Sequence, residues 1–176
     1  MTLLVFSLTL PGVTLLSEGE MVNFIESNSY SFSLTIISFI LVSFFWVYHH
    51  ELIKIKSLNI PFLWINIFYL ASISVIPFTM NMLSFYPKFF VTNLIFRTNI
   101  FLVTLSFLIM YIYAGKKGFL EYYPSKSEKH YVANTFIIVL GITIGVTFFD
   151  MNTSQNFMFL FLLIPIITTI RELRYK

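Results

Sequence analysis

His49, His50 and Glu51 stand next to one another in an apolar stretch, and imidazole and carboxylate groups are common metal ligands. Adjacent residues on a helix point about 100° apart, so these three side chains converge poorly on one ion. The string is better interpreted as an aromatic and imidazole belt at a membrane interface, or as a hydrogen-bonded bracket in which Trp46 and His49 or His50 tie helices together. We therefore predict no metal site and no cofactor.

Two further polar side chains interrupt apolar stretches. Asn66 follows Trp64 in the string LWIN, and its amide needs a partner on a neighbouring helix if lipid surrounds it. We place Trp64 and Asn66 in the same helix-bracing network. Arg97 lies about eight residues, or about 12 Å, into its stretch, where an unpaired charge is costly. We expect it to face the bundle interior; a functional role, a structural anchor and extension to the outer interface stay open.

Gly141 and Gly145 form a G-x-x-x-G pair in a chain that has only six glycines. Small residues at this spacing let two helix backbones approach closely inside a membrane. We expect the pair to mark the closest helix contact of the bundle.

Catalytic patterns are missing from the sequence. The chain has no cysteine, no P-loop, no H-E-x-x-H string and no G-x-S-x-G string. No apolar segment holds two carboxylates that could act together as an acid and a base, so we do not expect an enzyme. There is likewise no T-V-G-Y-G filter and no arginine-rich voltage sensor, which excludes an ordinary potassium-channel fold.

The elements that must position these side chains are membrane helices. The chain of 176 residues is 57% hydrophobic and 11% charged, which is too little charge to cover a water-soluble domain of that size. A spanning helix needs roughly 20 mainly apolar residues, so this length holds about five or six spans. The sequence predicts an all-α integral membrane protein with the lipid bilayer as its partner, and nothing in it indicates binding to nucleic acid.

One transmembrane domain is expected to cover the whole chain. Pro11-Gly12 ends the apolar start, residues 1–12, which is too short to span and is interpreted as the second half of a first helix. Pro77 is expected to kink its helix without ending it. Five full spans follow the partial one, and their predicted ranges are 30–53, 60–85, 89–114, 131–149 and 154–172.

Basic residues mark one side of this predicted bundle. Two of the eleven Lys and Arg residues follow the first full span, four follow the third and three follow the fifth. The opposite side has Lys88, together with several acidic residues. Because cytoplasmic loops carry an excess of positive charge, the basic side and the C-terminus are predicted to lie in the cytoplasm.

Three strings of the sequence resemble the potassium-channel family of the endosomal and lysosomal transmembrane protein 175, in its single-repeat prokaryotic form. They are MTLLV at the start, FWVYHHEL at 45–52 and LWIN at 63–66, and their order and spacing match over the first half of the chain. The resemblance implies a six-helix subunit in a prokaryotic plasma membrane. It further implies a homotetramer that conducts potassium, as permeant ion, through a hydrophobic constriction lined by the first helix.

The resemblance also assigns positions within this chain. Thr2 falls at a pore-lining threonine position, and Leu3 and Phe6 fall at the next apolar rings, where Phe6 is bulkier than the usual leucine. In that family an Arg-x-x-x-Phe-Ser-Asp signature precedes these positions, and it would fall upstream of Met1. The positions that brace this signature are matched by Trp46, His49 and Trp64. We therefore expect a truncated first helix, and conduction that requires the missing half.

Two other classes of protein stay open at this stage. A secondary transporter is suggested by the buried charge of Arg97 and the proline-kinked helix around Pro77, because transporters use both features. A non-conducting structural membrane protein is the third hypothesis.

Overall fold

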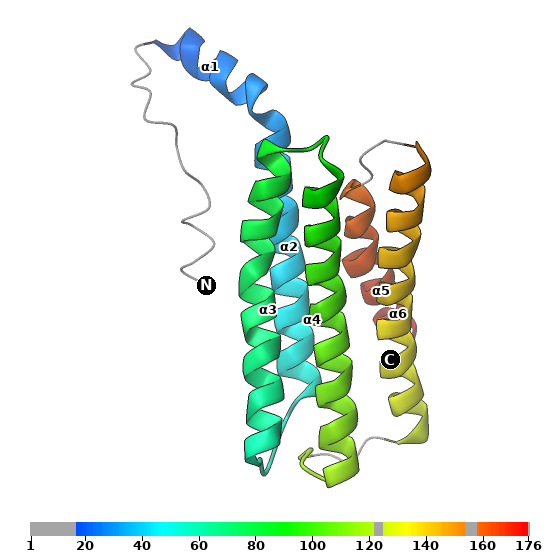
Figure 1. Ribbon diagram of the computed structural model, residues 1–176. Coiled ribbons are helices and arrows are strands. Elements are labelled where there is room, and N and C mark those ends of the chain that lie inside the picture. Colours follow the sequence, from blue (N-terminus) through cyan, green and yellow to red (C-terminus); the bar gives the residue numbers. More distant parts are fainter. Residues whose placement is uncertain (1–16, 122–124, 154–157, 176) are drawn as a thin grey trace.

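A computed structural model describes residues 17–121, 125–153 and 158–175 of the chain, without the side chains of 126, 129, 150–153, 158 and 172–175. Throughout this described part the regular elements are helices, which confirms the predicted all-α fold (Figure 1). The elements are α1 (Glu18–Ser27), α2 (Ser29–Leu52), α3 (Ile60–Phe85), α4 (Phe90–Lys117), α5 (Lys126–Thr153), the 3-10 helix η2 (Met158–Leu162) and α6 (Leu163–Tyr175).

Four of the described helices are long and apolar enough to cross a membrane, namely α2, α3, α4 and the part of α5 over residues 130–149. Their bounds agree within a few residues with the first four predicted spans. The fifth predicted span, 154–172, contains η2 and α6 and a shorter apolar helix, Phe159–Arg171. That this last segment crosses the membrane stays a prediction.

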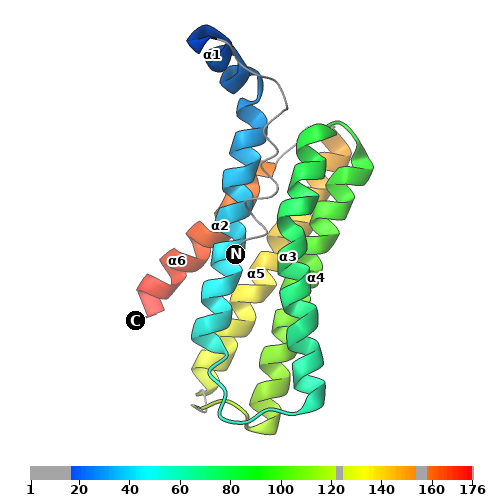
Figure 2. The same cartoon turned by 90° about the vertical axis from the view of Figure 1, so that its left-hand side faces the viewer.

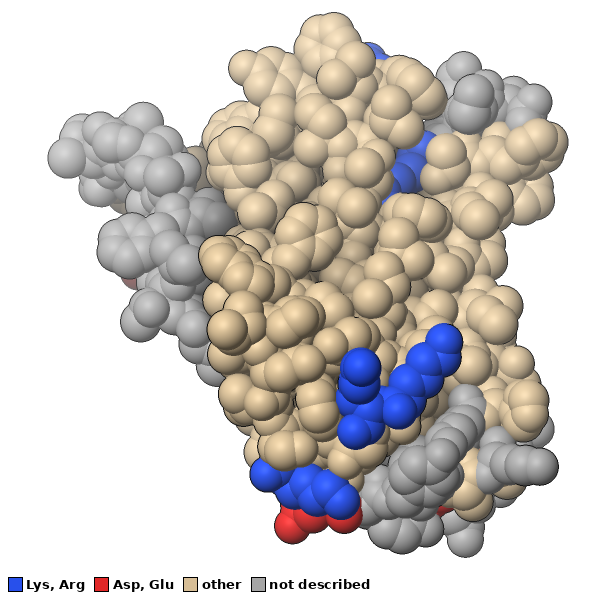
Figure 3. Space-filling view, turned by 60° about the horizontal axis from the view of Figure 1, so that its bottom comes forward, with Lys and Arg blue, Asp and Glu red and all other residues tan. Residues whose placement is uncertain are grey.

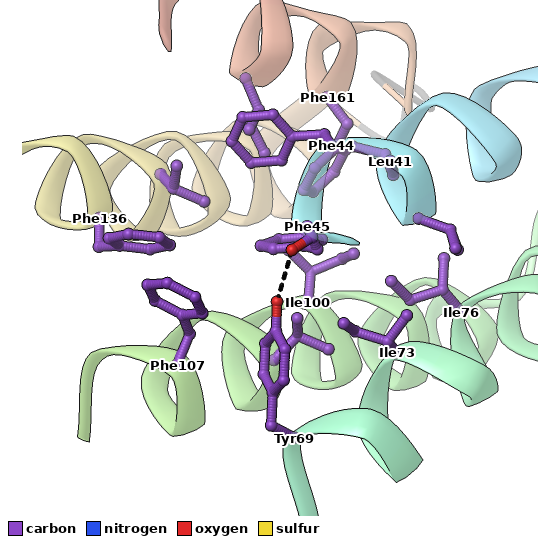
Figure 4. Close-up of a cluster of buried hydrophobic side chains, with 14 of the residues drawn as sticks. Leu41, Phe44, Phe45, Tyr69, Ile73, Ile76, Ile100, Phe107, Phe136 and Phe161 are labelled. Carbon is purple, nitrogen blue, oxygen red and sulfur yellow. Dashed lines mark hydrogen bonds between the residues drawn. The ribbon is translucent and has the colours of Figure 1, made fainter. Parts of the chain in front are cut away.

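The long helices pack side by side as an antiparallel bundle, in which α4 lies between α3 and α5 (Figure 1) and next to α3 at one edge of the bundle in the turned view (Figure 2). In the most apolar 18-residue window of α4, 56% of the residues are buried, compared with 33% in the corresponding window of each of the other three helices. Large side chains fill the interior, and Phe45, Phe107, Phe136 and Phe161 are all fully buried there (Figure 4). Lipid tails are as apolar as these side chains, so the hydrophobic effect does not drive the helices together inside a membrane. Close packing of the side chains stabilises the bundle instead.

The two basic loops of the described chain meet at one end of the bundle. The backbone N–H of Lys56 donates to the Phe119 carbonyl at 2.9 Å, and the N–H of Glu121 donates to the Lys54 carbonyl at 2.7 Å. These bonds join the loop after α2 to the loop after α4, as the predicted topology requires. Figure 3 shows the Lys and Arg side chains that gather toward this end.

The end of α4 differs slightly from the prediction. The helix continues past the predicted boundary at residue 114 to Lys117, and Gly118 then caps it with a φ of 67°. Only glycine adopts this left-handed conformation without strain, so the helix ends where the sequence supplies it rather than where the apolar residues run out.

Candidate functional site: a helix-bracing cluster between α2 and α3

The cluster centres on His49 in the last turn of α2 and Asn66 in the second turn of α3. The imidazole Nε2 of His49 lies 2.9 Å from the amide Oδ1 of Asn66, so the two side chains form a hydrogen bond between the helices. Both side chains are half-buried. The structure therefore gives Asn66 the partner on a neighbouring helix that an amide in lipid needs.

Tyr69 completes the cluster, one turn further along α3. Its ring stacks on the His49 imidazole with centroids 5.2 Å apart and an interplanar angle of 14°. Its hydroxyl donates to the backbone carbonyl of Phe45 at 2.8 Å, and the whole side chain is buried (Figure 4). Tyr69 was not among the predicted site residues, although its position three residues after Asn66 places it on the same helix face.

Trp46, His50 and Trp64 lie on the outer surface of the chain. Trp46 and His50, one turn apart on α2, stack on each other with centroids 5.6 Å apart and planes 7° apart. Trp46 is 52% exposed and Trp64 is 66% exposed. Of the two histidines that the bracket hypothesis offered, His49 therefore joins the helices, while Trp46, His50 and Trp64 present an aromatic surface outward.

Metal-binding groups do not gather in this cluster. Within the described residues, no three His, Asp or Glu side chains lie close enough together to hold one metal ion. Glu51 instead lies 3.7 Å from the Lys54 ammonium, and both side chains are more than half exposed. A surface ion pair of this kind contributes about 0–1 kcal/mol to stability.

Arg97 lies between α4 and α5. Its side chain is only 2% exposed, and it lines a cavity of about 350 Å³ with Thr143, Thr147 and apolar neighbours. The guanidinium is thus placed in the bundle interior, as the cost of a charge in lipid leads one to expect. Its role, functional or structural, stays a prediction.

Gly141 and Gly145 lie on α5, but no residue in the described part of the chain approaches them closely. A Cβ atom added at either glycine would meet nothing within 4 Å among the described residues. Among the described residues no close helix contact is thus seen at the pair, and the expected helix contact at these glycines stays a prediction.

Thr2, Leu3 and Phe6, the predicted pore-lining residues, lie outside the described residues. The candidate site that the structure describes is therefore the cluster between α2 and α3, which follow that segment in the sequence. It is not the predicted constriction.

Comparison with known proteins bears on this half of the chain. The sequence model of the family described as "Endosomal/lysosomal potassium channel TMEM175" matches residues 1–77, which confirms the resemblance seen in the sequence. No curated protein and no solved structure matches the chain. The matched range contains the predicted constriction and the whole His49, Asn66 and Tyr69 cluster, whereas Arg97 and the two glycines of α5 lie beyond it. The chain is thus a helical integral membrane protein, and its residues 1–77 match a family of potassium channels.

Proposed function

We propose that this chain is a subunit of a potassium channel of that family. The observation that carries the proposal is the family match over residues 1–77. That range includes the segment that would line the pore, the whole of α2, and α3 as far as Pro77. The four long apolar helices support a membrane location, which a channel requires.

In this proposal potassium crosses a hydrophobic constriction formed by the first apolar segment. Leu3 and Phe6 supply apolar rings, and the Thr2 hydroxyl supplies a polar group beside them. Rings of this kind gate by dewetting, so the width of the ring decides whether water and ions enter. Four copies of the chain, arranged as a homotetramer, would close such rings around one axis.

The helix-bracing cluster has a mechanical part in this scheme. A constriction of apolar side chains keeps its width only if the helices behind it hold their positions. The hydrogen bond between His49 and Asn66 and the stacked ring of Tyr69 hold α2 and α3 in one register. Trp46 and Trp64 lie exposed on the same two helices, where they can contact the first segment of the same or a neighbouring subunit.

The proposed orientation places the basic loops and the C-terminus in the cytoplasm of a prokaryotic cell. The backbone bonds between the loops after α2 and α4 support it, since they bring Lys54 and Lys56 to the same end as Lys116 and Lys117. Arg171 of α6 lies over the ring of Tyr131, 5.1 Å from its centroid, near the start of α5 at this end.

Potassium flux into liposomes tests the function. The purified chain is reconstituted, and potassium flux is driven by an imposed membrane potential, with protein-free liposomes as the control. A flux that rises with the imposed potential and does not saturate with potassium is expected. Absence of flux above the control would contradict the proposal and favour a non-conducting structural role.

A secondary transporter is the second candidate function. The observation that favours it is the buried Arg97 beside a cavity between α4 and α5, because transporters use intramembrane charges at substrate sites. Uptake that saturates with substrate and loses its coupling in Arg97→Gln would support the transporter. A linear current that persists in Arg97→Gln would support the channel.

A further inference from the structure

The short helix α1 has two chemically different faces. Met21, Val22 and Ile25 recur at helical spacing, and they are 47%, 53% and 50% exposed. By helical spacing Glu20 and Asn23 lie on the other side, Glu26 lies at its edge next to Val22, and Glu18 stands one turn before Met21 and Val22. None of the described α1 residues is buried. An exposed apolar stripe on a folded helix indicates a surface that something apolar covers.

Local hydrogen bonds explain why this segment is helical. Ser17 caps the helix, since its hydroxyl accepts from the Glu20 N–H at 3.2 Å and the Glu20 carboxylate accepts from the Ser17 N–H at 3.1 Å. This reciprocal capping box satisfies two of the N–H groups that a helix start leaves unpaired. The helix therefore has its own start signal in the sequence.

The junction with α2 fixes where α1 lies. Asn28 separates the two helices, and both its backbone N–H, at 3.1 Å, and its side-chain Nδ2, at 2.9 Å, donate to the Phe24 carbonyl. Phe24 and Phe32 also meet across the junction, with ring centroids 6.4 Å apart. Because α2 is long and apolar enough to span the membrane and begins at Ser29, α1 must end at the depth of the membrane surface, and from there it leans away from the bundle (Figure 1).

We propose that α1 is an interfacial helix, which lies in the membrane surface with Met21, Val22 and Ile25 in the lipid and its glutamates in water. A helix with one apolar and one charged face takes this position at a bilayer. Its charge selects the lipid, because α1 carries three glutamates and no Lys or Arg. The partner is therefore a zwitterionic lipid surface, on the side opposite the basic loops, and this holds whether or not the chain conducts.

The natural absence of cysteine makes a direct test possible, because one introduced cysteine then carries one spin label. The full chain is labelled as Met21→Cys or Ile25→Cys on the apolar face and as Asn23→Cys or Glu26→Cys on the polar face. Each variant is reconstituted in phosphatidylcholine vesicles. Collision rates are measured with oxygen, which concentrates in lipid, and with a water-soluble nickel chelate. Val75→Cys on α3 and Lys56→Cys in a loop serve as the lipid and water references.

The expected result is a several-fold higher ratio of oxygen to nickel collisions at positions 21 and 25 than at 23 and 26. Equal nickel access at all four positions would overturn the proposal, because α1 would then stand in water. Protection of positions 21 and 25 from both reagents would also overturn it, because protein would then cover the apolar face, whether a second copy or residues 1–16. Variants on α1 are expected to fold, since the helix contributes no buried side chain.

Discussion

The imidazole of His49 and the amide of Asn66 lie 2.9 Å apart and join the end of α2 to the beginning of α3. Both residues fall within the range that matches the channel family, and both lie close to the basic loops. Their hydrogen bond replaces two separate polar groups in lipid by one satisfied pair. Its loss should therefore loosen the contact between α2 and α3.

A double-mutant cycle measures this hydrogen bond. We expect His49→Phe and Asn66→Leu to show a coupling of about 0.6 kcal/mol in the free energy of unfolding, and at most about 1.7 kcal/mol, which are the average and the maximum for interhelical hydrogen bonds in membranes. Unfolding in mixed detergent micelles gives the value. The matched control is His50→Phe, whose ring stacks on Trp46, and its coupling with Asn66→Leu should be near zero. Equal coupling for both histidines would contradict the assignment.

Tyr69→Phe removes one hydroxyl and leaves the stacked ring in place. Because the hydroxyl donates to the Phe45 carbonyl at 2.8 Å in a fully buried site, its loss should lower the free energy of unfolding by about 1 kcal/mol. Tyr86→Phe, at a position that is 53% exposed, removes the same group near the surface and should change stability much less. Similar losses for the two variants would show that the buried bond contributes nothing specific.

Gly141→Ala and Gly145→Ala should be tolerated within a subunit. A Cβ at either position meets no described residue within 4 Å, and alanine favours a helix over glycine by roughly 0.5–1 kcal/mol. Unchanged or slightly raised thermal stability of the detergent-solubilised chain is therefore expected. Light scattering of the same samples reports on assembly. A variant that stays folded but loses its oligomer would show that the glycines face a neighbouring subunit.

Sidedness can be read from single cysteines. Lys56→Cys and Lys117→Cys should be labelled by an impermeant maleimide from the same side of a sealed vesicle, because backbone hydrogen bonds join the loops that follow α2 and α4. Lys88→Cys lies between α3 and α4 at the other end of the bundle and should be labelled from the opposite side. In cells the first two positions should be reached only after the membrane is opened. Labelling of all three from one side would contradict the bundle.

The lengths of the apolar runs predicted α2, α3, α4 and most of α5, because the thickness of a bilayer limits the length of a spanning helix. The partner of His49 could not be predicted in the same way. Which residues meet across two helices depends on how the helices are rotated and shifted relative to each other. The hydropathy pattern of one sequence gives neither the rotation nor the shift. The same reason explains why Tyr69 was missed and why, among the residues that the structure describes, Gly141 and Gly145 have no close neighbour.

Helix α1 was also missed, although its start signal is visible in the sequence. Ser17 and Glu20 stand at the spacing of a capping box, but the segment is too short and too acidic to resemble a span. A search for spanning helices passes over such a segment. Short amphipathic helices at the membrane surface have to be sought by their caps and their two faces instead.

The conductance of ring variants tests the proposed constriction most directly. Phe6→Leu places a smaller side chain in the proposed ring and so widens it. Water should enter the wider ring more readily, and the single-channel potassium conductance in a planar bilayer should rise. Ile36→Ala, which shortens a side chain that is 61% exposed on α2, is the control and should leave the conductance unchanged. A conductance that stays the same in Phe6→Leu, or that changes equally in Ile36→Ala, would contradict a pore lined by the first segment.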